Sequence, residues 1–250
     1  VSEANLTDDP LRLLRGLRLA SEIPLTISSQ TMAWIQRHAP RLPEAAPERI
    51  LSELQRLVRG DNADAAITTL KTLQLLRPWA AEGQLPAPAD AEGLSSTEAA
   101  FALPLSRLTA LISDEGMIQL RASRALRQRC ERLRFWQERT GQAPESLREP
   151  DRLQLHDELE QDLPALAIQL PMPEKAIWVH RWRDANDPLF HPRAPMDGNS
   201  LMKTLQIPPG PRLGKLLDHL KLEHAFQRIQ TPTEAVEEAK RFLALESDAL

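Results

Sequence analysis

The chain has 250 residues, of which 42% are hydrophobic and 26% are charged, and its formal net charge is −4. This length is enough to bury a core in one large or two to three smaller domains, and no apolar run approaches the roughly 18 residues of a membrane span. The charged N-terminal segment has no apolar signal core and the single cysteine excludes an internal disulfide, so we expect a cytoplasmic protein without a membrane partner.

Helical periodicity dominates the chain and runs of alternating strand residues are absent, so we predict an all-α fold. The first helix is expected to begin at Asp8 or Asp9, with Pro10 in its first turn. The third is expected to end at Gly60, a suitable C-cap. The expected helices, in chain order, cover residues 10–20, 29–38, 47–60, 63–79, 97–113, 116–141, 198–207, 213–226 and 233–245.

Two stretches without periodicity separate these helices. Residues 82–92, rich in Ala, Pro and Gly, form a candidate domain boundary, and residues 171–198 form a second irregular region after a proline-punctuated acidic segment. The Trp and His side chains of the second region fit no zinc-ligand spacing, so we expect them to pack in the core beneath it. They are Trp178, His180, Trp182 and His191.

The first helix carries Asp9, Arg12, Arg15 and Arg18 at intervals of three, so each side chain neighbours the next on the helix surface. An Asp beside an Arg offers acceptors and a planar fork of donors to the edge of a base, and further arginines can hold phosphates. The alternative is an Asp favoured by the helix dipole and arginines on a solvated face. The spacing by itself favours this alternative.

The stretch DDPLRLLRGLRLASEIPLTISSQT resembles the segment that follows the catalytic head in the tRNA nucleotidyltransferase/poly(A) polymerase family. The family pattern is Glu-Asp-Pro-Leu-Arg, two apolar residues, then Arg-Ala-x-Arg-Phe-Ala. Two later stretches, PERILSELQRLVRG and DGNSLMKTLQIPPGPRLGKLL, resemble further family motifs in the same order. Together the three matches favour a functional role for the first helix.

The resemblance implies an elongated array of helices without a catalytic β-sheet. Its parts are a neck-like domain over 1–82, a body-like domain over 93–170 and a tail-like domain over 171–250 that binds tRNA. It also implies the function of the corresponding part of a bacterial CCA-adding enzyme, whose partners are the tRNA 3′ end and the substrates CTP and ATP.

In CCA-adding members, the Asp and Arg of the first motif pair with the incoming base. Carried over, the resemblance implies that Asp9 and Arg12 read the base, that Asp8 replaces the family's Glu, and that Arg15 and Arg18 contact the nucleotide. In the second motif, Glu48 and Arg49 with Glu53, we expect a structural role on a helix that braces the first; an exposed set of ion pairs, which contributes little in water, is the alternative.

Two regions are candidates for binding RNA. The helix over 121–139 carries seven arginines and two glutamates, a local basic surface in an acidic protein, and a solvated face is its alternative. In the tail motif, three of the nine glycines fall within a short stretch, which indicates special backbone angles or close approach; a plain turn is the alternative. The resemblance implies tRNA contacts for both regions. The candidate RNA-binding residues are Arg121, Arg124, Gly198, Lys203, Gly210, Arg212, Gly214 and Lys215.

Phosphoryl transfer needs carboxylates that hold divalent metals, and the family supplies them from an Asp-x-Asp element in its head. The chain contains no Asp-x-Asp. We therefore expect no cofactor in this chain and no catalysis by it alone; Mg²⁺ and a head domain, in cis or in trans, belong to a full enzyme. The alternatives are a headless RNA-binding or scaffolding paralogue and the same part of a poly(A) polymerase.

Overall fold

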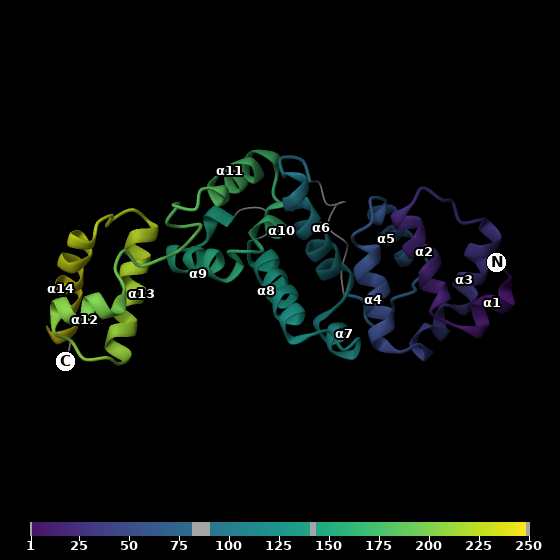
Figure 1. Cartoon of the computed structure of the whole chain (residues 1–250), viewed down its shortest axis with the longest axis horizontal. Helices are drawn as coiled ribbons and strands as arrows, with labels where there is room; N and C mark the ends of the chain where they lie inside the picture. The colour runs from purple at the N-terminus through teal and green to yellow at the C-terminus, as the bar shows by residue number, and fades with distance from the viewer. Residues whose placement is uncertain (1, 82–90, 141–143, 249–250) are drawn as a thin grey trace. The chain divides into compact units, whose positions relative to one another are not determined.

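A computed structural model describes residues 2–81, 91–140 and 144–248 (Figure 1). Within these ranges the chain forms fourteen α-helices, two short 3₁₀ helices and no β-strand, which confirms the predicted all-α fold. None of the described helices combines the length and the apolar character needed to cross a bilayer.

The elements follow one another in this order. They are α1 (Glu3–Asp8), α2 (Arg12–Glu22), α3 (Ser29–His38), η1 (Ala39–Glu44), α4 (Pro47–Leu57), α5 (Ala63–Thr72), α6 (Ser96–Leu111), α7 (Asp114–Gln119), α8 (Arg124–Thr140), η2 (Pro144–Ser146), α9 (Glu149–Leu159), α10 (Leu163–Ala167), α11 (Met172–Arg183), α12 (Gly198–Leu205), α13 (Pro211–Ala225) and α14 (Pro232–Asp248).

The chain divides into two compact units. Unit 1 contains residues 1–139 and 164–175, and unit 2 contains residues 140–163 and 176–250. The division into parts over 1–82, 93–170 and 171–250 stays a prediction. The expected boundary loop falls almost entirely on residues 82–90, outside the described residues.

The N-terminal half of unit 1 is organised around α2. Its leucines Leu13, Leu14 and Leu17 are almost fully buried, and α2 packs against α4 and α5 (Figure 1). Leu54 of α4, the helix that packs against α2, is also fully buried. The leucine stripe read from the sequence is therefore the core-facing side of this helix, and its polar side carries the candidate site.

Gly60 is not the C-cap of α4, so this prediction was wrong. The helix ends at Leu57 with Val58 in the cap position. A Cβ on Gly60 would lie 2.3 Å from the carbonyl oxygen of Ser21, and that oxygen also accepts the Asn62 N–H at 2.9 Å. The glycine is needed because two backbone segments approach closely there.

Other helix assignments also differ from the expectation, and α9 and α10 lie in the acidic segment where no helix was predicted. The helix α1 was not expected; it rests on tertiary contacts, such as Arg41 donating to the Thr7 carbonyl at 3.0 Å. The expected helix over 116–141 is divided into α7 and α8 at Arg121, whose φ is +55°. Residues 172–183 of the irregular region over 171–198 form the helix α11.

In unit 2, α12, α13 and α14 enclose a hydrophobic cluster of their own, which includes Leu201, Leu216 and Ile229. Trp178 is buried against His156 and Phe190, with ring centroids 5.0 and 5.5 Å from its own, so its predicted core packing is confirmed.

The other three side chains of that expected core group are less buried. Trp182 and His191 are half-buried: the Trp182 Nε1 donates to the Glu160 carbonyl at 2.6 Å, and the His191 ring contacts the Glu160 carboxylate at 2.9 Å. His180 is exposed, so core packing was the wrong prediction for it. It lies on the solvent side of α11.

Candidate nucleotide and RNA interface

Asp9 starts α2 through hydrogen bonds to the backbone. Its Oδ1 accepts the Leu11 N–H at 3.2 Å, and its main-chain oxygen accepts the Arg12 N–H at 3.0 Å. Asp8 is exposed and is the last residue of α1. Of the two carboxylates, only that of Asp9 therefore bonds to the start of α2, and its negative charge is favourable at that helix end.

Glu53 of α4 joins two of the candidate arginines. Its two carboxylate oxygens each accept one hydrogen bond, from the Nε of Arg15 at 3.0 Å and from the Nε of Arg18 at 3.0 Å. The Arg18 Nη1 also lies 2.5 Å from the Glu22 carboxylate. The Arg18 and Glu53 side chains are only 11% exposed, so these charges are compensated within the protein.

The exposed side of this site continues the pattern of alternating charges. The Asp9 carboxylate lies 3.7 Å from the Arg15 Nη1 and 3.5 Å from the Arg49 Nη2. At the other end, the Arg56 Nη2 lies 3.2 Å from Glu22. Sequence reasoning missed Glu22, although its position four residues after Arg18 is the usual signal for a helix ion pair.

Arg12 is separate from this set. Its Nη1 donates to the Asn5 carbonyl at 2.8 Å, and it forms no ion pair with any described residue. The predicted base-reading partners Asp9 and Arg12 are not hydrogen-bonded to each other here, because Asp9 is turned toward Arg15 and Arg49. Arg12 therefore keeps guanidinium donors for another group, and its assignment to the nucleotide stays a prediction.

The carboxylates at this site do not suit a metal ion. Asp9 is held by the Leu11 N–H and two arginines, and Asp8 belongs to the preceding helix. No group of three or more His, Cys, Asp or Glu among the described residues could hold a metal. The residues present do not fit a divalent ion, and we assign no metal-dependent step to them.

Three arginines of the 121–139 stretch have different surroundings. Arg134 is structural, since its guanidinium donates to the carbonyls of Thr109 and Ile112 at 2.7 Å each. Arg121 is exposed and its Nη1 lies 2.6 Å from Glu48. Arg124 is exposed and has no partner among the described residues. The sequence did not distinguish these roles, because the partners of Arg121 and Arg134 lie in distant parts of the chain.

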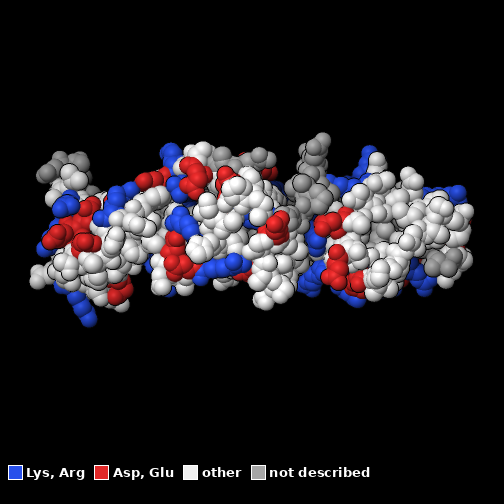
Figure 2. Space-filling view, turned by 90° about the horizontal axis from the view of Figure 1, so that it is seen from above, with Lys and Arg blue, Asp and Glu red and all other residues white. Residues whose placement is uncertain are grey.

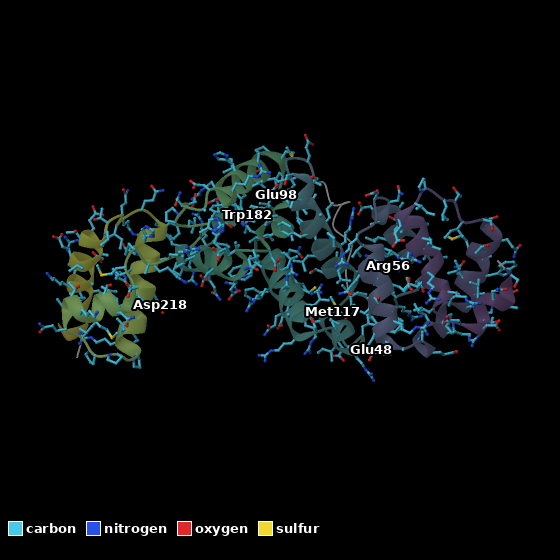
Figure 3. All side chains as sticks on the ribbon, viewed as in Figure 1. Glu48, Arg56, Glu98, Met117, Trp182 and Asp218 are labelled. Carbon is cyan, nitrogen blue, oxygen red and sulfur yellow. The ribbon has the colours of Figure 1, made fainter. Side chains whose placement is uncertain are left out.

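Glu48 and Arg56 lie toward opposite ends of α4 (Figure 3). The pKa of Glu48 is lowered, first by its own backbone N–H at the start of α4 and then by Arg121. On the face drawn in Figure 2, Lys and Arg are interleaved with Asp and Glu and do not gather in one patch. Any RNA contact on this face therefore depends on individual unpaired cations.

The three glycines of the tail motif have different surroundings. Gly210 has φ +155°, a conformation that side chains disfavour, so its predicted special backbone is confirmed. A Cβ on Gly198 would lie 3.3 Å from the Leu217 side chain, which is close packing. A Cβ on Gly214 would meet nothing within 4 Å, so no contact within the chain requires this glycine.

The candidate cations of the tail all lie at the surface. Lys203 of α12 and Lys215 of α13 are exposed and have no described partner. The Arg212 guanidinium donates to the Leu243 carbonyl at 3.3 Å, which ties the start of α13 to α14. Two lysines are therefore free for phosphate, while Arg212 has a structural contact as well.

Comparison with known proteins identifies the relatives of this chain. Residues 24–82 match the family described as the probable RNA and SrmB-binding site of polymerase A. The CCA-adding enzyme of Lactiplantibacillus plantarum is 36% identical over 94 residues, which cover 38% of this chain and 22% of that enzyme. The CC-adding tRNA nucleotidyltransferase of Geobacter sulfurreducens is 24% identical over 278 residues, 94% of this chain and 63% of its own length.

A solved structure of a CCA-adding enzyme has a similar fold. The crystal structure of the Bacillus stearothermophilus CCA-adding enzyme in complex with CTP matches this chain with a TM-score of 0.69 and 17% identity. The match covers 99% of this chain and 65% of the chain of that enzyme. The chain is therefore similar to tRNA nucleotidyltransferases over part of their length. It spans less than two thirds of the length of these relatives.

The family match begins at residue 24 and therefore does not include the first motif, which ends at Arg18. The matched residues 24–82 include α3, α4 and α5, whereas the Asp9–Arg18 motif lies on the preceding helix. Because α2 packs on α4 and α5, the structure brings the motif against the segment that matches this family. Glu53 belongs to that segment and holds Arg15 and Arg18 of the motif, which is the brace expected from the sequence.

Proposed function

We propose that the chain is the tRNA-binding and nucleotide-recognising part of a CCA-adding tRNA nucleotidyltransferase, which acts on the tRNA 3′ end with CTP and ATP. The observation that carries this proposal is the packing of α2, with its Asp9–Arg18 motif, on a segment that matches an RNA-binding family. Relatives that add CCA or CC to tRNA support the choice of RNA.

In this proposal each charged residue of the first helix has a distinct task. Arg12 meets the incoming base or its phosphates, because its guanidinium forms no ion pair with the residues that the structure describes. Asp9 supplies the acceptor for the base edge after releasing Arg49, whose contact is long at 3.5 Å. Arg15 is 39% exposed and reaches the nucleotide, while the buried Arg18 positions Glu53.

Nucleotide binding by the purified chain tests the proposal. We expect Arg12→Ala to weaken CTP and ATP binding at least tenfold, since a charge-assisted hydrogen bond contributes about 1.5–3 kcal/mol. The exposed Arg37→Ala, which removes a surface contact with Glu3, is the matched control and leaves affinity unchanged. Equal affinities of the wild type and Arg12→Ala would contradict the base-reading role.

We also propose that the chain alone does not extend tRNA, because the residues that the structure describes include no cluster of carboxylates able to hold a metal. Incubation with CTP, ATP, Mg²⁺ and a tRNA lacking its 3′ CCA is the direct measurement. Any templated incorporation by the chain alone would contradict this part of the proposal, and incorporation restored by an added head domain would support it.

A poly(A) polymerase is the second candidate, since the family description names polymerase A. A headless RNA-binding or scaffolding protein shares the same surfaces. Affinities for a tRNA transcript and for an oligo(A) strand of equal charge distinguish the candidates. Preference for tRNA supports CCA addition, preference for oligo(A) supports the polymerase, and RNA binding without nucleotide binding supports the scaffold.

A further inference from the structure

A hollow of about 540 Å³ in unit 1 lies outside the site described above. Its volume is within the range of small-molecule and cofactor pockets. It lies where the end of α5, the turn that follows and the last residue of α6 meet. The described residues that line it are Leu70, Lys71, Gln74, Leu76, Arg77, Ala80, Ala81 and Leu111.

The walls of this hollow are fixed by backbone hydrogen bonds. The Ala81 N–H donates to the Leu111 carbonyl at 3.1 Å, and the Ser113 N–H donates to the Trp79 carbonyl at 2.9 Å. Behind them, Gly116 approaches Trp79 so closely that a Cβ there would lie 2.3 Å from the Trp79 oxygen. The hollow is therefore preformed by the chain's own packing.

Two cations line the hollow without an acidic partner. Lys71 and Arg77 form no side-chain hydrogen bond or ion pair with any other residue that the structure describes, and no Asp or Glu is among the described lining residues. Lys71 is half-buried, and burial lowers the pKa of its ammonium. A partly desolvated cation without a counter-charge is unfavourable, and an anion bound beside it would compensate its charge.

Capping of α5 does not explain Lys71. The last carbonyls of the helix already have backbone partners: the Leu73, Gln74 and Leu75 N–H groups donate to the oxygens of Thr69, Lys71 and Leu70. Gln74 completes this ending with φ +52°, and its amide lines the hollow beside the cations. The ammonium group is thus free for a ligand.

We propose that this hollow is an RNA contact, in which Lys71 and Arg77 hold a backbone phosphate and the leucine wall receives the adjoining nucleoside. Cations bind phosphate by charge, an apolar wall covers a sugar or base face, and an amide can bond a base edge. The inference deepens the proposed function and rests on it: residues 70–81 lie within the segment that matches an RNA-binding family.

The salt dependence of tRNA binding tests this inference. The plot of log Kobs against log salt has a negative slope, and each lost phosphate contact makes that slope less steep by about 0.7–0.9. We expect Lys71→Ala and Arg77→Ala each to make the slope less steep by this amount, and the double variant to do so by about twice as much. Lys71→Arg keeps the charge and the slope. Lys240→Ala, at an exposed lysine of α14 outside all the proposed contacts, is the control.

The outcomes separate this inference from the proposed function. Wild-type chain that fails to bind tRNA overturns both. Binding with unchanged slopes in Arg77→Ala and in the double variant overturns only the inference and leaves the hollow to an acidic protein partner. Because Arg77 is exposed, its variant keeps the fold and the test stands even if Lys71→Ala is unstable. A third outcome also overturns the RNA contact: free CMP binds in the hollow, and the variants leave the salt dependence of tRNA binding unchanged. The hollow would then be assigned to mononucleotides.

Discussion

The carboxylate of Glu53 accepts a hydrogen bond from the Nε of Arg18 at 3.0 Å, and both side chains are buried. The same carboxylate accepts the Nε of Arg15 with its other oxygen. One residue of α4 therefore orients two arginines of α2, so the stability of this helix pair and the geometry of the candidate nucleotide site depend on the same charge.

Glu53→Gln is expected to destabilise the protein by about 3 kcal/mol, because it leaves the buried Arg18 short of a counter-charge. The measurement is urea unfolding, with a lower midpoint and an unchanged slope. Glu44→Gln removes an exposed partner of Arg41 and serves as the control, with no measurable change. A midpoint shift as small as that of the control would show that Glu22 alone satisfies Arg18.

Gly60→Ala is expected to lower stability by several kcal/mol, since the new methyl group would overlap the Ser21 backbone. The matched control is Gly16→Ala in the middle of α2, where the nearest atom to the new Cβ is a side-chain carbon of Ile27 at 3.9 Å. That substitution should raise stability by about 0.5–1 kcal/mol through helix propensity. Thermal unfolding of the two variants should therefore move in opposite directions, and equal shifts would contradict the close approach.

The sequence predicted the fold class and the leucine face of α2, because both follow from the spacing of apolar residues. Residues 29–38 were predicted to be a helix and form α3. Helix ends were harder: Arg121, Gln206 and Gln227 have positive φ after α7, α12 and α13, where glycine is the usual signal. The helix α11 was missed because its apolar residues form no stripe, with Ile177 exposed beside the buried Trp178.

The candidate site was predictable only in part. The intervals between Asp9, Arg12 and Arg15 gave the residues, and the family resemblance gave the bracing role of Glu53. The orientation of Arg15 and Arg18 depends on a helix more than thirty residues away, as their bonds to Glu53 show. No periodicity within one helix contains that information.

Gln206→Gly is expected to stabilise the protein by about 1 kcal/mol, because Gln206 caps α12 with φ +51° and a Cβ disfavours that conformation. The same substitution at Gln128, an exposed position inside α8, should destabilise by a similar amount. Denaturation midpoints of the two variants check the sign. Destabilisation by both would mean that Gln206 makes a stabilising contact with its side chain.

His156 is expected to make stability fall in acid. The pKa of His156 is lowered from 6.5 to about 3, mainly by burial. The positive charges of Arg181 and Arg152 lower it further, and His191 contributes a smaller lowering. The negative charge of Asp187 opposes these effects. The folded state therefore excludes a proton that the unfolded chain binds below about pH 6.5. Stability from this residue is fully present above pH 6.5 and is lost as the pH falls toward 3.

The slope is the measurable quantity, at about 1.4 kcal/mol per pH unit between roughly pH 6 and 4. His156→Leu keeps a side chain of similar volume between Trp178 and Phe190 and removes the titrating group, together with a buried Nδ1 that has no partner. The difference in unfolding free energy between the variant and the wild type should be constant from pH 7 to 8 and should then shift in favour of the variant as the pH falls. A difference that stays constant down to pH 4 would contradict the lowered pKa, because the folded protein would then bind the proton at His156 as readily as the unfolded chain does.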